Sequence, residues 1–424
     1  METSSPKTLP SAREAALDLM AAIMGEEKIL SEVAPKVLGR LTPAEAARAN
    51  RLANGVFRNL QRCDRVLGRF VRQLPPEDVM NTLRLATYEM LALGEAPHGV
   101  VSTAVNTVRK RSGEAGLGRM ANAVLRKVAG SELLWADLPV PELPKTLRKP
   151  LMAAYGGARL RAIEAVQAGD PPVDLTRQRD VDVPGAVALP TGSLRLAQQG
   201  QVSALPGFED GSWWVQDAAA ALPVPLLGDV KGARALDMCA APGGKTMQLA
   251  AAGAQVTALD VSKRRLKTVA ENLTRTGLTA EMIAADALDW EPDAPFDAVL
   301  LDAPCSATGT IRRNPDLPFA KRDLDLKPLV ALQAALLDRA LSFVRPGGVI
   351  VFCTCSLLPD EGEAQLQAAL TRHAELSLDP IGPDDLPGLH LDWVQDGALR
   401  ITPDTWAEHG GIDGFFIARL KRAE

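Results

Sequence analysis

The run of residues 237–246 constrains the fold most strongly, because it predicts a buried strand that turns directly into a helix. We expect the strand at 233–238 and the helix at 244–252, with the Pro-Gly-Gly turn 242–244 between them. Two glycines let the backbone bend sharply and let a ligand approach without meeting a Cβ atom. The helix that follows presents free N–H groups and the positive end of its dipole to an anion. This arrangement is typical of a cofactor pocket at the carboxyl end of a strand in a doubly wound α/β sheet.

Strand-like apolar runs and amphipathic helices alternate from residue 233 to the end of the chain. Alternation of this kind predicts a parallel, Rossmann-like sheet with helices on both faces. The last strand is expected to be an antiparallel addition near the edge. The predicted strands are 233–238, 255–260, 280–286, 296–302, 347–353 and 414–420, and the predicted helices are 244–252, 262–275, 325–344 and 360–373.

The first 130 residues show helical periodicity throughout, which predicts an all-α bundle. Two capping boxes mark helix starts there, Ser11 with Glu14 and Thr42 with Glu45.

A proline-rich stretch follows the bundle, with a helix expected at 149–168 and short strands at 181–183 and 194–196. The chain is therefore predicted to be multidomain. Its parts are a helical domain at 1–130, a linker with a small α/β connecting subdomain at 131–210, and the α/β domain at 211–424.

The length of 424 residues agrees with two or three domains. No run of about 18 or more apolar residues is present, so no membrane span is predicted. Residues 1–7 lack the apolar core of a signal peptide. Five cysteines in a chain without an export signal favour free thiols in a reducing compartment, so we expect a cytoplasmic protein.

The net charge of −5 hides an asymmetry along the chain. Residues 1–130 contain 19 Lys and Arg against 13 Asp and Glu, whereas the remainder contains 28 against 39. The excess of basic residues in this amino-terminal region points to a polyanionic partner. Five arginines there would share one face of a helix, provided that the helix continues unbroken from 58 to 74. Such a face is either solvated surface or an RNA-binding stripe that contacts phosphates; its members are Arg58, Arg62, Arg65, Arg69 and Arg72.

The glycine-containing loop alone is compatible with three cofactors. A phosphate-binding P-loop requires G-x-x-x-x-G-K-[ST], and Gly244-Lys245-Thr246 matches its end, but Cys239 stands where the first glycine belongs. An NTPase is therefore a rival interpretation, weakened by the missing glycine. The G-x-G-x-x-G spacing of a dinucleotide loop does not occur here. S-adenosylmethionine, the third cofactor, requires acids at the neighbouring strand ends for its ribose hydroxyls and adenine amino group.

Acidic residues close four of the predicted strands or their loops, namely Asp237, Asp260, Asp286 and Asp302. A single acid in such a place would be assigned to a helix cap or a turn. Four in register favour S-adenosylmethionine, with Asp260 on the ribose and Asp286 near the adenine.

Two cysteines lie in polar loops after predicted strands, Cys305 in Asp-Ala-Pro-Cys and Cys355 in Cys-Thr-Cys-Ser. Cys63 and Cys353 fit the usual role of a small buried side chain. The spacing is not that of zinc ligands, so no metal is predicted, and the compartment disfavours a disulfide. The role that remains for these two cysteines is that of a nucleophile. A thiolate that adds to carbon 6 of a pyrimidine makes carbon 5 able to accept a methyl group. The residues alone do not rank the two cysteines.

Four longer motifs carry a resemblance to a known family. They are Asp237-Met-Cys-Ala-Ala-Pro-Gly-Gly-Lys-Thr246, Leu301-Asp-Ala-Pro-Cys-Ser-Ala-Thr-Gly-Thr-Ile-Arg-Arg-Asn-Pro-Asp316, Thr354-Cys-Ser356 and Asp413-Gly-Phe-Phe416. With them the chain resembles the Sun (Fmu) family of RNA cytosine-5 methyltransferases, which use S-adenosylmethionine. Residues 11–130 are similar to the helical RNA-binding domain of the antitermination factor NusB, through Asn54-Gly-Val-Phe-Arg58, Pro97-His98 and Ala121-Asn-Ala-Val-Leu-Arg126. This pairing points to the bacterial type that acts on 16S ribosomal RNA.

The resemblance implies a role for each candidate residue. Cys355 would be the nucleophile and Cys305 would assist release of the covalent adduct. Beyond these roles, Asp302 could also meet the cytosine. Lys245 either fixes Asp302 or Cys355 or is a cation at the start of a helix with no role in the chemistry. S-adenosylmethionine would be held by Cys239, Ala240, Ala241, Pro242, Gly243, Gly244, Lys245, Asp260, Asp286 and Asp302.

The expected partner is 16S ribosomal RNA, and we expect a monomer. A non-catalytic RNA-binding assembly factor is the remaining alternative, against which the intact Cys305, Cys355 and Lys245 argue.

Overall fold

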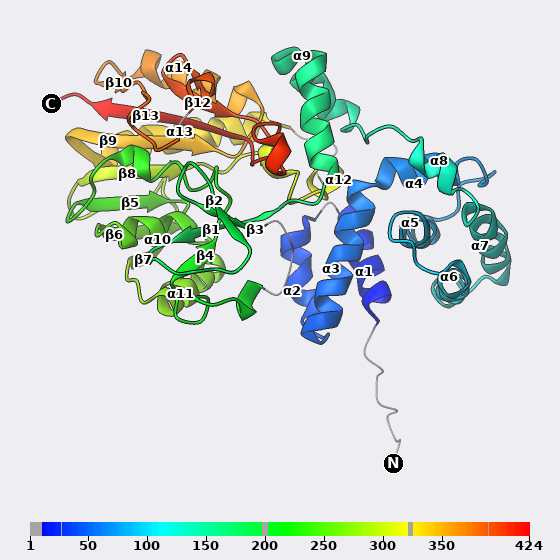
Figure 1. The fold of residues 1–424 in the computed structure, drawn as a ribbon. Coiled ribbons are helices and arrows are strands. Elements are labelled where there is room, and N and C mark those ends of the chain that lie inside the picture. Colours follow the sequence, from blue (N-terminus) through cyan, green and yellow to red (C-terminus); the bar gives the residue numbers. More distant parts are fainter. Residues whose placement is uncertain (1–10, 27, 197–201, 321–324, 389) are drawn as a thin grey trace. The chain divides into compact units, whose positions relative to one another are not determined.

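The structure is a computed structural model that describes residues 11–26, 28–196, 202–320, 325–388 and 390–424 (Figure 1). Its residues pack into two compact units, each of which is described by itself. The first, called the helical unit, lies within residues 1–149, 160–169 and 313–323, and the second, called the α/β unit, lies within 150–159, 170–312 and 324–424. In the described ranges, no helix has the length and apolar character needed to cross a membrane.

The α/β unit is built on a mixed sheet of order β11-β12-β13-β9-β8-β5-β6-β7, with β10 paired to β13 outside this path. The strands are β5 Arg234–Met238, β6 Gln255–Asp260, β7 Glu281–Ala284, β8 Phe296–Asp302, β9 Val344–Thr354, β10 Leu376–Leu378, β11 Val394–Gln395, β12 Ala398–Ile401 and β13 Phe415–Arg422. The helices on its two faces are α10 Gly244–Ala251, α11 Lys263–Thr276, α13 Lys327–Phe343 and α14 Glu363–Arg372 (Figure 1). Strands β5 to β9 are parallel and β13 is antiparallel to β9. The predicted doubly wound sheet with an antiparallel last strand is thus confirmed, although β12 and β10 lie beyond that strand.

Alternate residues of the central strands face two separate cores, as expected for a sheet that is covered on both sides. On β8, Ala298 and Leu300 pack into one core, whereas Val299 and Leu301 pack into the other. Helix α13 covers the second core through Leu336. The continuous apolar run of β8 follows from this double burial.

A four-stranded antiparallel sheet of order β2-β3-β1-β4 also belongs to the α/β unit. Its strands are β1 Val173–Arg177, β2 Ala186–Ala188, β3 Leu194–Leu196 and β4 Trp213–Val215. The strand predicted at 194–196 is confirmed, but the one predicted at 181–183 is wrong. Val183 packs into the core of this sheet from a turn, in which its carbonyl accepts the N–H of Ala186 at 3.0 Å. A buried loop side chain therefore produced the strand-like pattern.

The helical unit confirms the predicted all-α bundle. Its helices are α1 Ala12–Glu26, α2 Leu30–Leu38, α3 Pro43–Arg58, α4 Leu60–Leu67, α5 Glu77–Leu91, α6 Pro97–Ser112, α7 Ala115–Val128, α8 Glu132–Ala136 and α12 Leu317–Ala320, while α9 Lys145–Ala168 has a kink at Gly156 and residues in both units.

The first predicted capping box is complete, since Ser11 accepts the backbone N–H of Glu14 at 3.3 Å and Glu14 accepts that of Ser11 at 3.1 Å. The second is only half formed. Thr42 accepts the N–H of Glu45 at 3.3 Å, but the Glu45 carboxylate accepts the N–H of Ala12 at 2.9 Å instead and so joins α3 to α1.

The condition for a shared arginine face, an unbroken helix from 58 to 74, is not met. Helix α3 ends at Arg58 and α4 covers only Leu60–Leu67, with Asn59 between them at φ −110° and ψ 14°. The Asn59 side chain donates to the carbonyl of Gly55 at 3.0 Å. Asparagine side chains compete with the backbone for hydrogen bonds in this way and disfavour helix interiors.

The five arginines of the predicted stripe consequently have different surroundings. Arg62 donates to the carbonyl of Trp135 at 2.6 Å and lies 4.4 Å from the centre of its ring. Arg58 is half-buried, and the exposed members are Arg65, Arg69 and Arg72. RNA binding through the five arginines stays a prediction, and the single continuous face that supported it is not formed.

A short segment from late in the sequence completes the helical unit. Asp316 accepts the N–H of Leu30 at 2.7 Å, and the ring of Phe319 in α12 stacks on Phe57 with centroids 5.6 Å apart. The two units therefore interleave along the chain, and the predicted connecting segment 131–210 is shared between them.

Candidate active site

The carboxyl ends of β5 and β8 meet where the strand order of the α/β unit reverses. Strands β6 and β7 continue from β5 on one side, whereas β8 and β9 lie on the other. Open parallel sheets bind their ligands in the crevice outside such a switch point. The predicted residues that follow β5, β6, β7, β8 and β9 are all brought to this edge of the sheet.

The loop after β5 turns through two residues in the left-handed region, Cys239 with φ 63° and Gly243 with φ 102°. A residue with a Cβ atom rarely adopts this conformation, and such strain is concentrated at functional sites. At Gly243 a Cβ atom would also lie 3.1 Å from the side chain of Val269. Both conformation and space therefore favour glycine at this position.

Asp237 is fully buried at the end of β5. Its Oδ2 atom accepts the hydroxyl of Thr246 at 2.6 Å, which ties the strand to α10. Its Oδ1 atom has no hydrogen-bond partner among the described residues. Burial raises the pKa of Asp237 to about 7, against the opposing effect of the bond from Thr246.

The two acids assigned to the nucleoside of the cofactor differ in exposure. Asp260 is almost fully buried and accepts the N–H groups of Ala241 at 3.1 Å and Ser262 at 2.8 Å. Because a carboxylate has about four acceptor sites, Asp260 can hold the loop and still accept hydroxyl groups. Asp286 is exposed just beyond β7 and accepts the N–H of Leu288 at 2.9 Å.

Lys245 and Asp302 form an ion pair between α10 and the end of β8. The Nζ and Oδ2 atoms lie 2.7 Å apart, and Nζ is 5.4 Å from the ring centre of Phe415. Burial alone would lower the pKa of Lys245, but the attraction of Asp302 outweighs it and raises that pKa above its ordinary value. Lys245 therefore stays charged and fixes Asp302, one of the two partners considered from the sequence.

The two loop cysteines lie side by side and are half-buried, with the sulfurs of Cys305 and Cys355 3.4 Å apart. The hydrogen bond with Cys355, together with burial, raises the pKa of Cys305 well above its ordinary value. Burial likewise raises the pKa of Cys239 and Cys353. Cys305 is therefore a neutral thiol in contact with Cys355.

A fully buried carboxylate, Glu361, joins the two cysteine loops. It accepts the N–H of Ser306 at 2.8 Å and the hydroxyls of Ser306 and Ser356, each at 2.5 Å. These serines directly follow Cys305 and Cys355 in the chain. One side chain thus fixes the residue next to each cysteine.

The same loops also touch through their backbones. Gly309 donates its N–H to the carbonyl of Cys355 at 2.9 Å and accepts the N–H of Gly414 at 2.8 Å. A Cβ atom on Gly309 would lie 2.0 Å from the carbonyl oxygen of Gly414, which real Cβ atoms do not tolerate. Glycine at 309 therefore lets the loops after β8 and β9 pack against the start of β13.

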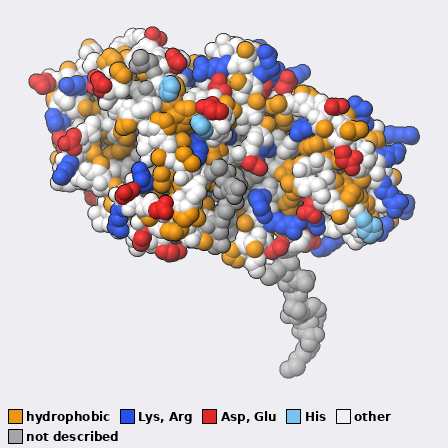
Figure 2. All heavy atoms as spheres, viewed as in Figure 1, with side chains coloured by type: hydrophobic (Ala, Val, Ile, Leu, Met, Phe, Trp, Pro, Cys, Tyr) orange, Lys and Arg blue, Asp and Glu red, His pale blue; other side chains and the backbone are white. Residues whose placement is uncertain are grey.

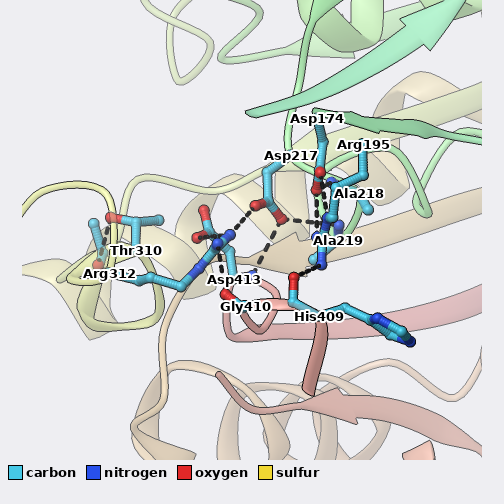
Figure 3. A network of polar contacts seen from close by, with 11 residues as sticks. Asp174, Arg195, Asp217, Ala218, Ala219, Thr310, Arg312, His409, Gly410 and Asp413 are labelled. Atoms are coloured by element: carbon cyan, nitrogen blue, oxygen red, sulfur yellow. Dashed lines mark hydrogen bonds and ion pairs between the residues drawn. The ribbon is translucent and has the colours of Figure 1, made fainter. Parts of the chain in front are cut away.

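A buried ionic network supports this packing (Figure 3). Arg312 donates to Asp217 at 2.5 Å and to Asp413 at 3.3 Å, and Asp217 also accepts the N–H of Asp413 at 3.2 Å. Arg195 and Asp174, joined by two bonds of 2.7 Å, extend the network to the small antiparallel sheet. Removing one partner from a buried pair costs about 3–5 kcal/mol, so the network strongly favours this arrangement of strands and loops.

Glu361, Arg312 and Gly309 were not among the predicted site residues. Glu361 bonds to Ser306, 55 positions away, and Arg312 bonds to Asp217, 95 positions away, so the sequence around each does not reveal these partners. Gly309 and Arg312 could have been found in the sequence, because both lie within the motif Leu301–Asp316.

In the described part of the chain, no group of three or more His, Cys, Asp or Glu could hold a metal ion.

Comparison with known proteins assigns both units. Residues 224–421 match the family described as 16S rRNA methyltransferase RsmB/F, and residues 10–130 match the NusB family. The chain is 33% identical over 440 residues to ribosomal RNA small subunit methyltransferase B of Enterobacter sp. (strain 638), covering 96% of this chain and 98% of that protein. The protein of the same name from Escherichia coli O139:H28 is 32% identical over 439 residues with equal coverage. The crystal structure of PH0851 shares the fold over the whole of both chains, with a TM-score of 0.75 and 23% identity.

The fold and the site thus define a methyltransferase with a Rossmann-like catalytic domain and a NusB-like helical domain. The chain belongs to the family of 16S rRNA methyltransferases RsmB/F. The resemblance to the Sun family and to NusB is confirmed, and the loop 239–245 is that of a methyltransferase rather than of a P-loop NTPase.

We expect Glu361→Gln to lower kcat by up to roughly 100-fold, because small displacements of reacting groups have effects of this size. Because the N–H of Ser306 and the amide of Gln333 both donate to Oε1, the glutamine carbonyl would stay there. Its NH2 group would then replace Oε2, and the hydroxyls of Ser306 and Ser356 would lose their carboxylate acceptor and have to reorient. Single-turnover methylation of ribosomal RNA measures the rate, and the affinity for the methyl donor should not change.

Asp360→Asn is the matched control, since Asp360 is exposed and adjoins Glu361. If both variants methylated at the same rate and melted at the same temperature, Glu361 would not be needed to position the cysteines.

Proposed function

We propose that this methyltransferase modifies carbon 5 of a cytosine in 16S ribosomal RNA through a covalent cysteine adduct. The observation that carries the proposal is the 3.4 Å separation of the Cys305 and Cys355 sulfurs, at the ends of the neighbouring parallel strands β8 and β9. Carbon 5 of a pyrimidine is a poor nucleophile until a thiolate adds to carbon 6. The relatives named as small subunit methyltransferases support 16S ribosomal RNA as the substrate.

S-adenosyl-L-methionine is the methyl donor, and when bound it supplies an electrophilic methyl group on sulfur. The residues at the crevice fit it. The start of α10 suits its carboxylate, and Asp260 and Asp286 offer acceptors to hydroxyl and amino groups. Oδ1 of Asp237 is a further buried acceptor. Positions 239–244 carry no side chain larger than cysteine or proline, which permits close approach.

Cys355 is the nucleophile in this mechanism. Its thiolate forms a bond to carbon 6, and the electrons of the C5–C6 double bond move to carbon 5, which then takes the methyl group. A general base takes the proton on carbon 5, which returns those electrons to the ring and breaks the S–C6 bond, so that the thiolate leaves.

Cys305 assists the release step. Because its pKa is raised, it is a neutral thiol that can donate a hydrogen bond to the departing Cys355 thiolate. Asp302 stands three residues before Cys305, where it can meet the cytosine, and Lys245 fixes its carboxylate.

We expect Cys355→Ser to abolish methyl transfer, because a serine hydroxyl is far less readily ionised than a thiol. Transfer of tritium from methyl-labelled S-adenosylmethionine to unmodified 16S ribosomal RNA measures it. Calorimetry should show unchanged binding of the methyl donor. Full activity in this variant would exclude Cys355 as the nucleophile.

We expect Cys305→Ser to accumulate a covalent protein–RNA adduct, since the leaving thiolate would lose the thiol beside it. A denaturing gel should show a slowly migrating species that contains both protein and RNA. The double variant Cys305→Ser/Cys355→Ser is the control and should show none. Normal turnover without an adduct would contradict the release role of Cys305.

A further inference from the structure

A basic groove runs between α6 and α7 of the helical unit, away from the arginines that the sequence singled out. Its volume is about 760 Å³. The polar side chains that line it include Arg109, Arg119, Arg126, Asn106, Asn122 and His98. No acidic side chain is among the described residues of its lining. In the view of Figure 2, Lys and Arg side chains are frequent where Figure 1 labels these helices.

The groove arginines differ from other cations on the same helix. Lys110 and Arg111 of α6 are ion-paired, with Glu14 and Asp18 of α1 at 2.6 Å each. By contrast, Arg109, Arg119 and Arg126 are exposed, and none of the three forms an ion pair with a described acid. The helix therefore uses some of its cations to hold the bundle together and leaves others available on the groove side.

The segment that forms the groove is also strongly basic as a whole. Residues 97–130 contain six Lys and Arg and one acid, Glu114. Acids of α1 compensate Lys110 and Arg111, and an anionic ligand would relieve the mutual repulsion among the other four cations. The concentration of charge thus favours an anionic ligand over a solvated surface.

A glycine of α7 makes room for the side chain of one groove arginine. A Cβ atom on Gly118 of α7 would lie 2.6 Å from Cγ and 2.8 Å from Nε of Arg109 on α6. Gly118 is buried and helical, so its backbone conformation does not require glycine. The absence of a side chain lets Arg109 lie across α7, which holds its guanidinium group at the groove.

We propose that the groove between α6 and α7 binds the phosphate backbone of the ribosomal RNA substrate, through Arg109, Arg119 and Arg126. Guanidinium groups pair with phosphate in a bidentate manner. Asparagine side chains, here Asn106 and Asn122, are typical additional donors to phosphate and sugar oxygens. The inference rests on the proposed function, because it takes ribosomal RNA as the ligand.

The test compares two triple variants that each remove three exposed positive charges from the helical unit. Arg109→Gln/Arg119→Gln/Arg126→Gln alters the groove. The matched control, Lys36→Gln/Arg40→Gln/Arg51→Gln, alters three exposed cations of the same unit to which no RNA contact is assigned. Binding to an unmodified 16S ribosomal RNA transcript is measured as a function of KCl concentration.

We expect the groove variant to bind roughly 10–100-fold more weakly near 0.1 M salt and to reduce the slope of log K against log salt by about 2. The control should change both quantities less. Equal effects of the two variants, or unchanged RNA binding by the groove variant, would overturn the proposal; in the second case an acidic protein partner would become the better explanation.

Methylation by the unaltered protein is followed in parallel, so that the two proposals fail separately. If the unaltered protein methylated the RNA but the groove variant bound it as tightly as the unaltered protein does, only the proposed role of the groove would be contradicted. Loss of binding in the groove variant, with no carbon-5 methylation by the unaltered protein, would contradict the proposed reaction alone.

Gly118→Ala separates RNA contact from folding. Alanine is the better helix former, so the melting temperature should stay the same or rise. The new methyl group would displace the Arg109 side chain and should weaken RNA binding. Wild-type affinity in a well-folded Gly118→Ala protein would show that the placement of Arg109 is not used.

Discussion

The buried carboxylate of Glu361 is the interaction on which the geometry of the active site depends. Cys305 and Cys355 stand on loops that leave different strands, so tertiary contacts must set the distance between their sulfurs. Each donor that meets Glu361 would cost about 1–3 kcal/mol if it were buried without a partner. The need to satisfy the neighbours of both cysteines at one carboxylate therefore holds the thiols together.

Strand β13 contributes more to the site than its place beside β9 suggests. Its approach brings Gly414 against Gly309 and places the ring of Phe415 near Lys245. Just before the strand, Asp413 enters the buried network of Arg312. The antiparallel addition thus closes the back of the catalytic loops, which the parallel strands alone would leave uncovered.

The sequence predicted β5 to β9 and β13, because doubly buried strands such as 296–302 are continuous apolar runs whose recognition requires no knowledge of their partners. The short strands β1, β2, β4, β10, β11 and β12 were not predicted. The prediction failed where the spacing of residues along the chain indicates an element that the structure does not form. Residues 58–74 carry arginines at helical spacing, yet Asn59 interrupts the helix. The site residues differ in the same way in how well the sequence predicts them. Gly243 and Cys355 lie in motifs that can be recognised in the sequence, whereas Glu361 has its role because serines on two separate loops donate to it.

The packing of α12 determines which fragments of this protein can fold and remain active. Phe319 stacks on Phe57, and Asp316 accepts the N–H of Leu30, so the segment after Arg312 is buried by residues from the first 60 of the chain. A fragment that starts at residue 211 would keep α12 but lose the surface that covers it. Such a fragment would expose the ring of Phe319, seven residues after Arg312. Soluble catalytic fragments should therefore require either the amino-terminal part in trans or a replacement for residues 313–323.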